Sequence, residues 1–129
     1  MAYAATVTLT RKGNDYVVVI SETEAAAASE ATITGLPITG RVQRQMCSLT
    51  AGTGTTVDPK LTLTSGGTGV NIVVENGTAG ANIDNVSDPA IPFANTDAVM
   101  YHKSVVDADT DNSVTTVYYI SGGTPATGW

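Results

Sequence analysis

The sequence predicts an all-β protein, built as a single antiparallel β-sandwich of seven to eight strands, Ig-like or jelly-roll-like, with extended N- and C-terminal arms. Three observations support this. Thr, Val and Ile make up 43 of the 129 residues, and their β-branched side chains suit a pleated surface better than a helix. Charged residues amount to only 14%, which argues against disorder and against a long solvated helix. Short alternating runs are separated by Gly, Asn, Asp and Pro.

The length of 129 residues predicts one domain, because a chain of this size can bury a core of its own. We expect residues 1–4 to form an N-terminal arm. Residues 122–129, rich in Gly and Thr and carrying the only Trp, are expected to form a flexible C-terminal tail.

The first element expected is a β-hairpin. Apolar and Thr residues alternate over 5–11, turn residues occupy 12–15, and a second strand follows over 16–20. Because Val17, Val18 and Val19 place apolar groups on both faces, this second strand is expected to be covered on both sides.

The remaining chain reads mostly as strands. Residues 22–30 contain an Ala run and predict either a single helical turn or an extended connection. Further strands are expected at 31–34, 38–49, 61–64, 70–75, 98–106 and 114–120. Residues 76–97 contain many strand breakers but also apolar side chains, which indicates an ordered excursion.

Charge excludes two classes of partner. The net charge is −6, and the six basic residues are scattered along the chain. Nucleic-acid binding requires clustered Lys and Arg, and an anionic membrane surface would repel this chain, so neither partner is expected. The single Cys47 excludes an intrachain disulfide and a Cys-rich zinc site. It lies in a predicted strand, where a buried, unreactive side chain is expected.

Catalytic chemistry is not expected, and no cofactor is implied. His102 is the only histidine, so a multi-histidine metal site is excluded. A triad of Ser104, His102 and an Asp lacks the Gly-x-Ser-x-Gly elbow. His102 is therefore expected to be an ordinary surface or rim histidine, and the protein is predicted not to be an enzyme.

One acidic motif suggests an alternative metal site. Asp107, Asp109 and Asp111 alternate in a predicted loop, and such carboxylates can wrap Ca²⁺. The motif fails as an EF-hand, because Asn112 stands at the sixth position and Tyr118 at the twelfth. A solvated acidic turn is the main interpretation, and a calcium loop remains the alternative.

Four segments of the chain form a recognisable pattern: Ile38-Thr39-Gly40-Arg41-Val42, Asp58-Pro59-Lys60-Leu61-Thr62-Leu63-Thr64, Asp97-Ala98-Val99-Met100-Tyr101 and Val117-Tyr118-Tyr119-Ile120. In this pattern the chain resembles small virion structural proteins of tailed bacteriophages. The resemblance covers roughly residues 31–121 without a diagnostic motif. It implies a non-enzymatic capsid decoration or cement protein that binds the outside of the shell and bridges neighbouring subunits.

This resemblance also implies partners and a location. The partner would be the major capsid protein or another virion protein, and the chain would form a homo-oligomer, with a trimer as one form. Tyr3, Phe93 and Trp129 are the aromatic residues expected to contact the partner. The residues show no signal peptide or membrane span, so we expect synthesis in the host cytoplasm and a place in the virion.

The alternative function predicted from the sequence is that of an Ig-like or carbohydrate-binding β-sandwich module of a tail, fibre or surface appendage. It predicts ligand-contacting aromatic side chains gathered at one end of the sandwich. The available residues are Tyr16, Phe93, Tyr101 and Tyr118 or Tyr119.

Overall fold

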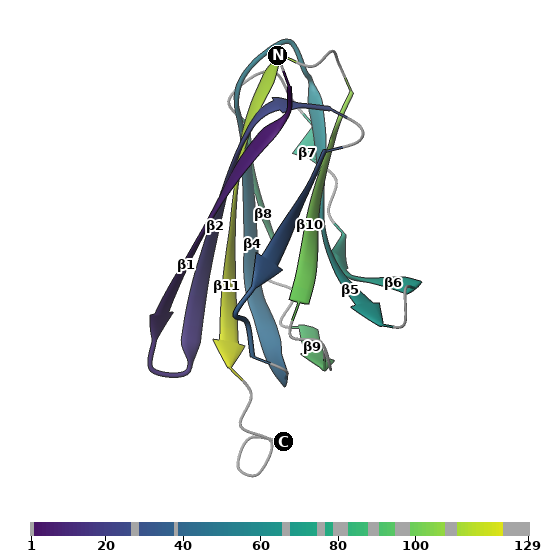
Figure 1. Ribbon diagram of the computed structural model, residues 1–129. Coiled ribbons are helices and arrows are strands. Elements are labelled where there is room, and N and C mark those ends of the chain that lie inside the picture. The colour runs from purple at the N-terminus through teal and green to yellow at the C-terminus, as the bar shows by residue number, and fades with distance from the viewer. Residues whose placement is uncertain are drawn as a thin grey trace.

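The computed structural model describes residues 2–26, 29–37, 39–65, 68–74, 77–78, 83–87, 91–94, 99–107 and 111–122. These residues form two antiparallel sheets packed face to face, as Figure 1 shows. The predicted all-β sandwich is confirmed. No helix within the described ranges is long and apolar enough to cross a membrane.

The first sheet, called sheet A, contains the strands from both ends of the chain. Its order is β1 (Ala4–Lys12), β2 (Asp15–Ala25), β11 (Asn112–Gly122), β4 (Thr39–Ala51) and β8 (Ile83–Ser87), and β9 (Ile91–Ala94) pairs with the start of β4. Sheet B has the order β3 (Ser29–Thr34), β10 (Val99–Val106), β5 (Thr56–Ser65) and β6 (Thr68–Val74), and β7 (Gly77–Thr78) pairs with β5.

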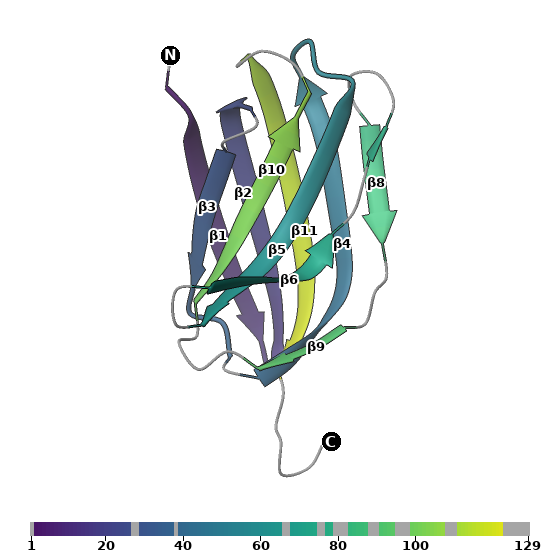
Figure 2. The ribbon, with the colours of Figure 1, turned by 90° about the vertical axis from the view of Figure 1, so that its right-hand side faces the viewer.

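The connections identify the sandwich as a jelly roll. Strands β2-β11-β4-β8 of sheet A face β3-β10-β5-β6 of sheet B, and the chain crosses between the sheets at almost every step. Eight strands in this order make the double Greek key of a jelly roll, so the jelly-roll alternative holds in preference to the Ig-like one. Strand β1 is an addition at the edge of sheet A, beside β2 (Figure 2).

The predicted opening hairpin is confirmed. Strands β1 and β2 pair without interruption from Ala4 opposite Thr23 to Lys12 opposite Asp15. Gly13 has φ +62°, and a glycine at the first central position of a two-residue turn is the pattern of a type II′ hairpin turn. Ala4, the last residue of the predicted N-terminal arm over residues 1–4, is the first residue of β1. Gly122 likewise ends β11, and residues 123–129 of the predicted tail lie outside the described residues.

Of the two alternatives predicted for residues 22–30, the described residues fit the extended connection, because they belong to or flank strands, and residues 27–28 lie outside the described residues. Strand β2 continues to Ala25, and β3 starts at Ser29 in the opposite sheet. The Ser29 side chain closes this corner, because its Oγ accepts a hydrogen bond from the Ala26 N–H at 2.6 Å. Glu24 takes φ +56°, the one positive φ of a non-glycine residue in the described ranges, where the register between β2 and β11 shifts.

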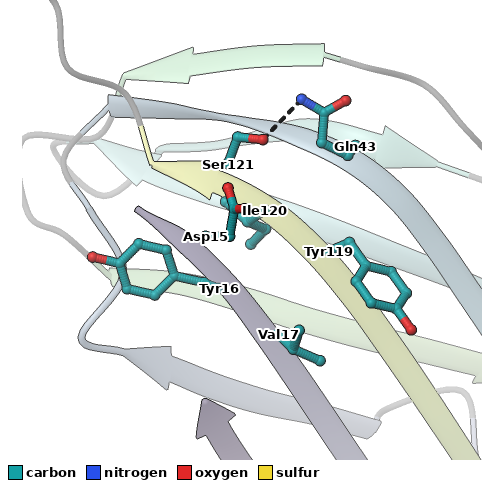
Figure 3. Close-up of a pocket in the computed structure, with 7 residues that line it drawn as sticks. All are labelled: Asp15, Tyr16, Val17, Gln43, Tyr119, Ile120 and Ser121. Atoms are coloured by element: carbon teal, nitrogen blue, oxygen red, sulfur yellow. Dashed lines mark hydrogen bonds between the residues drawn. The ribbon is translucent and has the colours of Figure 1, made fainter. Parts of the chain in front are cut away.

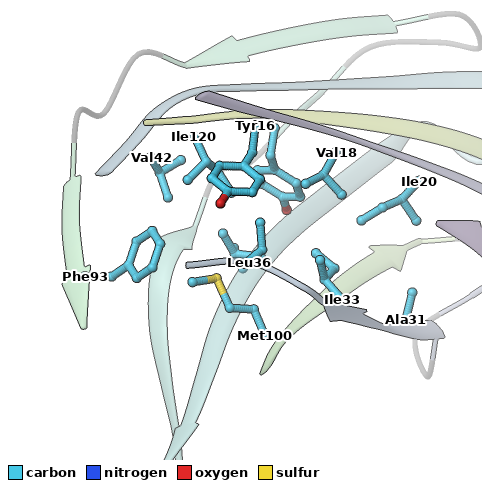
Figure 4. Packing of buried hydrophobic residues seen from close by; sticks show 12 residues of the cluster. Tyr16, Val18, Ile20, Ala31, Ile33, Leu36, Val42, Phe93, Met100 and Ile120 are labelled. Carbon is cyan, nitrogen blue, oxygen red and sulfur yellow. The ribbon is translucent and has the colours of Figure 1, made fainter. Parts of the chain in front are cut away.

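Apolar side chains from both sheets fill the interior in two clusters. Figure 4 shows the larger one, with Tyr16, Val42 and Ile120 from sheet A facing Leu36 and Met100. The smaller cluster contains Ala25, Cys47, Leu49, Val57, Val106 and Val114, with Tyr3 packed against it.

Strand β2 is covered on one face only, so the expectation that both faces would be covered is wrong. Val18 and Ile20 are fully buried in the core, whereas Val17 and Val19 are half-exposed on the outer face of sheet A. The three consecutive valines reflect β propensity as well as burial.

The predicted irregular excursion over 76–97 contains the short strands β7, β8 and β9 in its described part. Strand β5 begins five residues earlier than predicted, at Thr56. Pro59 lies within β5 opposite Ser104 of β10, and no described residue of β6 or β7 pairs with it on the other side.

Candidate functional site

The only histidine lies at the centre of a buried polar cluster between the sheets. His102 on β10 contacts Glu22 Oε1 on β2 through Nε2 and the Tyr118 hydroxyl on β11 through Nδ1, both at 2.9 Å. The Glu22 Oε2 atom accepts hydrogen bonds from the Tyr3 hydroxyl at 2.6 Å and the Ser104 hydroxyl at 2.9 Å.

The expectation that His102 is a surface or rim histidine is wrong, since its exposed fraction is 0%. The physical reason is its register. His102 alternates along β10 with Met100 and Ser104 on the inner face, opposite Leu61 and Ala31. A polar ring is stable in this interior because both of its nitrogens have partners.

The electrostatics of the cluster favour an ionised Glu22. Burial raises the pKa of Glu22, but the hydrogen bond and charge of His102, with hydrogen bonds from Tyr3 and Ser104, outweigh burial and leave the pKa below its ordinary value. Burial also raises the pKa of Tyr118 well above its ordinary value, with the charges of Cys47 and Glu22 acting in the same direction.

The hydrogen bonds of this cluster differ from those of a Ser-His-Asp triad. Ser104 and His102 both bind Glu22, so the serine hydroxyl donates to a carboxylate and not to a histidine base. Glu22, His102 and Ser104 are all buried. Their contacts join β2 and β11 of sheet A to β10 of sheet B.

Cys47 is buried, as predicted, with 1% of its surface exposed. Its Sγ accepts a hydrogen bond from the Thr116 hydroxyl at 3.4 Å. Burial raises the pKa of the Cys47 thiol to about 11, so the thiolate is a minor form at neutral pH.

Two residues of the acidic loop, Asp107 and Asp111, accept hydrogen bonds from the segment that connects β4 and β5. Asp107 Oδ1 accepts the N–H groups of Thr55 and Thr56 at 2.8 and 3.0 Å, and Oδ2 accepts the Thr55 hydroxyl at 2.6 Å. These bonds hold the pKa of Asp107 well below its usual range. The Thr53 hydroxyl donates to Asp111 Oδ1 at 3.1 Å.

These contacts show where two of the three predicted calcium ligands lie. Asp109 lies outside the described residues, so the calcium alternative stays a prediction. Within the described ranges, no group of three or more His, Cys, Asp or Glu side chains is placed to hold a metal ion.

A shallow pocket lies on the outer face of sheet A, near the end of β11 (Figure 3). Its volume is about 160 Å³, and it is lined by Asp15, Tyr16, Val17, Gln43, Tyr119, Ile120 and Ser121. Tyr119 is 37% exposed, and among the described residues it is the one large hydrophobic side chain that is exposed. Tyr16 and Ile120 belong to the core cluster, so Tyr119 supplies the aromatic surface that a ligand would meet.

A β-bulge shapes this pocket. Tyr119 pairs with Arg44 and Ile120 pairs with Val42, which leaves Gln43 as an extra residue in β4. Gln43 therefore turns outward beside Arg44, and its Nε2 donates to the Ser121 hydroxyl at 2.9 Å. Bulges commonly redirect a side chain at binding sites.

Phe93 and Tyr3, two of the three aromatic residues expected to contact a partner, lie in different core clusters. Phe93 is 7% exposed and packs in the core, while the Tyr3 hydroxyl is bound to Glu22. Trp129 lies outside the described residues, and partner contact by these three residues stays a prediction.

The aromatic set predicted for a binding module is also divided. Tyr16, Phe93 and Tyr118 are buried, and Tyr101 is half-buried on sheet B, so these residues do not gather at one end. Tyr119 alone among them is exposed beside a pocket. The sequence pattern did not indicate Asp15, Gln43 and Ser121 as residues that line a pocket with Tyr119. The available signal was the adjacent pair Gln43 and Arg44, which interrupts the alternation of β4.

No protein-family model matches the chain, and no curated protein matches it. Among solved structures, the C-terminal family 22 carbohydrate-binding module of Clostridium thermocellum Xyn10B is 17% identical, with a TM-score of 0.48, and the match covers 95% of this chain and 87% of that one. The CBM32 of AlyQ is 12% identical, with a TM-score of 0.41, covering 88% and 92% of the two chains. The infectious bursal disease virus Gx strain structure is 12% identical, with a TM-score of 0.33, covering 97% of this chain and 34% of that one. These likenesses lie at the level of the β-sandwich.

Proposed function

We propose that this chain is a non-catalytic binding module that takes a carbohydrate at the pocket on the outer face of sheet A. The observation that carries the proposal is the exposed Tyr119 ring, flanked by a carboxylate from Asp15, an amide from Gln43 and a hydroxyl from Ser121. This is the alternative expected from the sequence, and it takes precedence over capsid decoration.

The chemistry of these side chains suits a sugar. A pyranose ring presents a face of C–H groups and an edge of hydroxyl groups. The electron-rich face of an aromatic ring attracts the C–H groups, and carboxylate, amide and hydroxyl groups exchange hydrogen bonds with the edge. The pocket has about half the volume of the smallest typical small-molecule sites, which start near 300 Å³. It therefore fits one unit of a longer chain.

Binding is favoured over hydrolysis by the composition of the pocket. Glycoside hydrolysis ordinarily requires two carboxyl groups flanking the bond that breaks. Asp15 is the one carboxylate among the residues that line this pocket. A sugar bound there would be held and not cleaved.

The test compares variants in a glycan array followed by titration calorimetry with the glycans that bind. Tyr119→Ala is expected to weaken binding at least about tenfold, or 1.4 kcal/mol, because it removes the ring. Tyr119→Phe keeps the ring and should retain most of the affinity. Tyr101→Ala removes a half-buried tyrosine from the opposite sheet and is the matched control.

Two results would overturn the carbohydrate proposal. One is an array in which the folded wild-type chain binds no glycan. The other is glycan binding that Tyr119→Ala leaves unchanged, which would locate the site elsewhere. Thermal melting of each variant shows whether the fold is intact.

Capsid decoration is the second candidate. The observation that favours it is the jelly-roll strand order, an architecture found in viral capsid as well as lectin domains. Mass spectrometry across a density gradient of particles from the native source tests it. A constant, high ratio to a major shell protein would support it, and absence from every particle band would remove it.

A further inference from the structure

Strand β1 has an open backbone edge. It runs for nine residues and pairs with β2 on one side, and no described strand pairs with its other side. In Figure 1 it lies at the outer margin of sheet A. An unpaired strand edge presents a row of N–H and C=O groups that can pair with another chain.

Strand β1 lacks two of the usual protections of an edge strand, a proline and a β-bulge. It contains no Pro, and its register with β2 runs from Ala4 to Lys12 without a bulge. Arg11 carries a positive charge on the face of β1 that is directed toward the core, but its side chain does not cover the backbone groups of the open edge. Its guanidinium lies 5.6 Å from the centre of the Tyr16 ring, and its Nε donates to the Gly13 carbonyl at 2.9 Å.

We propose that β1 is a dimerisation edge, at which two copies of this chain pair their β1 strands antiparallel about a two-fold axis at Thr8. The two A sheets would then form one continuous sheet. This inference does not depend on the carbohydrate site.

The backbone geometry supports this register. In a two-residue hairpin the pair next to the turn, here Lys12 and Asp15, is of the hydrogen-bonded type, and pair types alternate from there. The odd-numbered residues of β1 therefore direct their backbone groups away from β2. A two-fold axis at Thr8 places Val7 opposite Leu9 of the second copy, so the outward groups of both strands meet.

The side chains are self-complementary in this register. Thr8 lies opposite Thr8, and Thr6 lies opposite Thr10, and Thr–Thr pairs across strands are favourable. On the inner face, Val7 and Leu9 are half-buried and pack against the core, and pairing would cover them further.

Charge favours a second copy as the occupant. Strand β1 ends at two basic residues, Arg11 and Lys12. The other end lies beside Tyr3, on which the charge of the exposed Glu30 acts. Antiparallel pairing brings Lys12 of one copy opposite Ala4 of the other, next to the Tyr3 on which the charge of Glu30 acts, and two-fold symmetry repeats this arrangement. The basic end of each copy thus meets the end of β1 at which Glu30 contributes a negative charge.

Cysteine cross-linking tests the register directly. Cα atoms in a non-hydrogen-bonded antiparallel pair lie about 4.5 Å apart, within the range of a disulfide. Thr8→Cys is therefore expected to give a covalent dimer under mild oxidation. Cys47 is buried and does not compete. Ser21→Cys, exposed on the neighbouring strand β2, is the matched control and should stay monomeric on a denaturing gel.

Charge exchange tests the same contact without a covalent bond. Thr8→Lys and Thr8→Glu each put two like charges on the two-fold axis and should raise the dissociation constant of the dimer about fivefold. An equimolar mixture of the two variants should restore association, because opposite charges then meet. Ser21→Lys adds the same charge away from the edge and should leave association unchanged.

Sedimentation over a range of concentrations measures these equilibria, with circular dichroism confirming that each variant is folded. A wild-type chain that stays monomeric throughout, with no cross-link in Thr8→Cys, would overturn the proposal. A dimer that Thr8→Lys leaves unchanged would also overturn it, because that dimer would use another surface.

Discussion

Glu22 is the residue at which the two sheets share polar contacts. It lies in a strand of sheet A and receives hydrogen bonds from Tyr3, Ser104 and His102. Removing one member of a buried charged pair leaves the other without its partner, which is more costly than the pair itself is favourable. The cluster therefore makes stability sensitive to substitutions at a few positions.

Stability should fall in acid because of Glu22. Its pKa is lower in the folded chain than in the unfolded chain, where it is about 4.3. The unfolded state thus binds the proton first, and the stabilisation present above that pH is lost as pH falls through the folded pKa. Chemical unfolding between pH 7 and pH 3 measures this loss.

The variant Glu22→Gln should be less stable at pH 7 by about 3 kcal/mol. It should also show a smaller decrease in acid than the wild type. Glu30→Gln changes an exposed carboxylate and is the control. An unchanged acid slope in Glu22→Gln would show that other groups set the pH dependence.

Gln45 is a buried residue whose amide is unsatisfied. It is 1% exposed, and neither Nε2 nor Oε1 has a hydrogen-bond partner in the described structure. An unsatisfied buried polar group is destabilising, so Gln45→Met, similar in size, should raise the free energy of unfolding by about 1–2 kcal/mol. Urea titration measures the change, with the exposed Gln43→Met as control. A loss of stability would mean that the amide contributes a favourable contact.

At the scale of elements, the hairpin and the bulge show what local sequence can specify. Alternation and the residues Gly13 and Asn14 were enough to predict the hairpin, because a tight turn depends on neighbouring residues. The bulge at Gln43 depends on the register between β4 and β11, which are about 70 residues apart in the chain. Local pattern does not determine that register, so the pocket it shapes was not predicted.

The type II′ turn should make Gly13 sensitive to substitution. Its φ of +62° disfavours a side chain, although no atom would clash with an added Cβ. Gly13→Ala should therefore lower the free energy of unfolding by about 1 kcal/mol through backbone strain alone. Asn14→Ala, with its ordinary negative φ, should change it little. Equal effects in urea titrations would contradict this account of the turn.

The loop that contains Asp107 should not respond to calcium. Both oxygens of its carboxylate already accept hydrogen bonds from Thr55 and Thr56, and a metal ion would have to replace them. We expect the same melting temperature in the presence of Ca²⁺ or a chelator. A rise with Ca²⁺ would indicate a calcium site, since ligands stabilise the state that binds them.

At the scale of the whole molecule, composition was sufficient for the fold class but not for its topology. A high content of β-branched residues predicts strands, whereas the choice between Ig-like and jelly-roll order depends on which distant strands pair. The burial of His102 was missed for a related reason. A histidine has no inherent preference for the interior, and its partners Glu22 and Tyr118 come from other strands.

The sandwich should unfold as one cooperative unit. Its two core clusters are linked by strands that contribute to both, including β2, β4 and β11, and by the buried polar cluster. Calorimetry should therefore give equal calorimetric and van't Hoff enthalpies. Two separate transitions would show that the clusters melt independently.

The presence of one histidine in the chain, and its location between the sheets, has a practical consequence. In a nuclear magnetic resonance spectrum the imidazole protons of His102 give one set of signals, which needs no assignment by mutagenesis. Solvent exchange at this ring requires the sheets to separate. The rate of that exchange therefore reports, without any added label, how often the interior of the molecule opens.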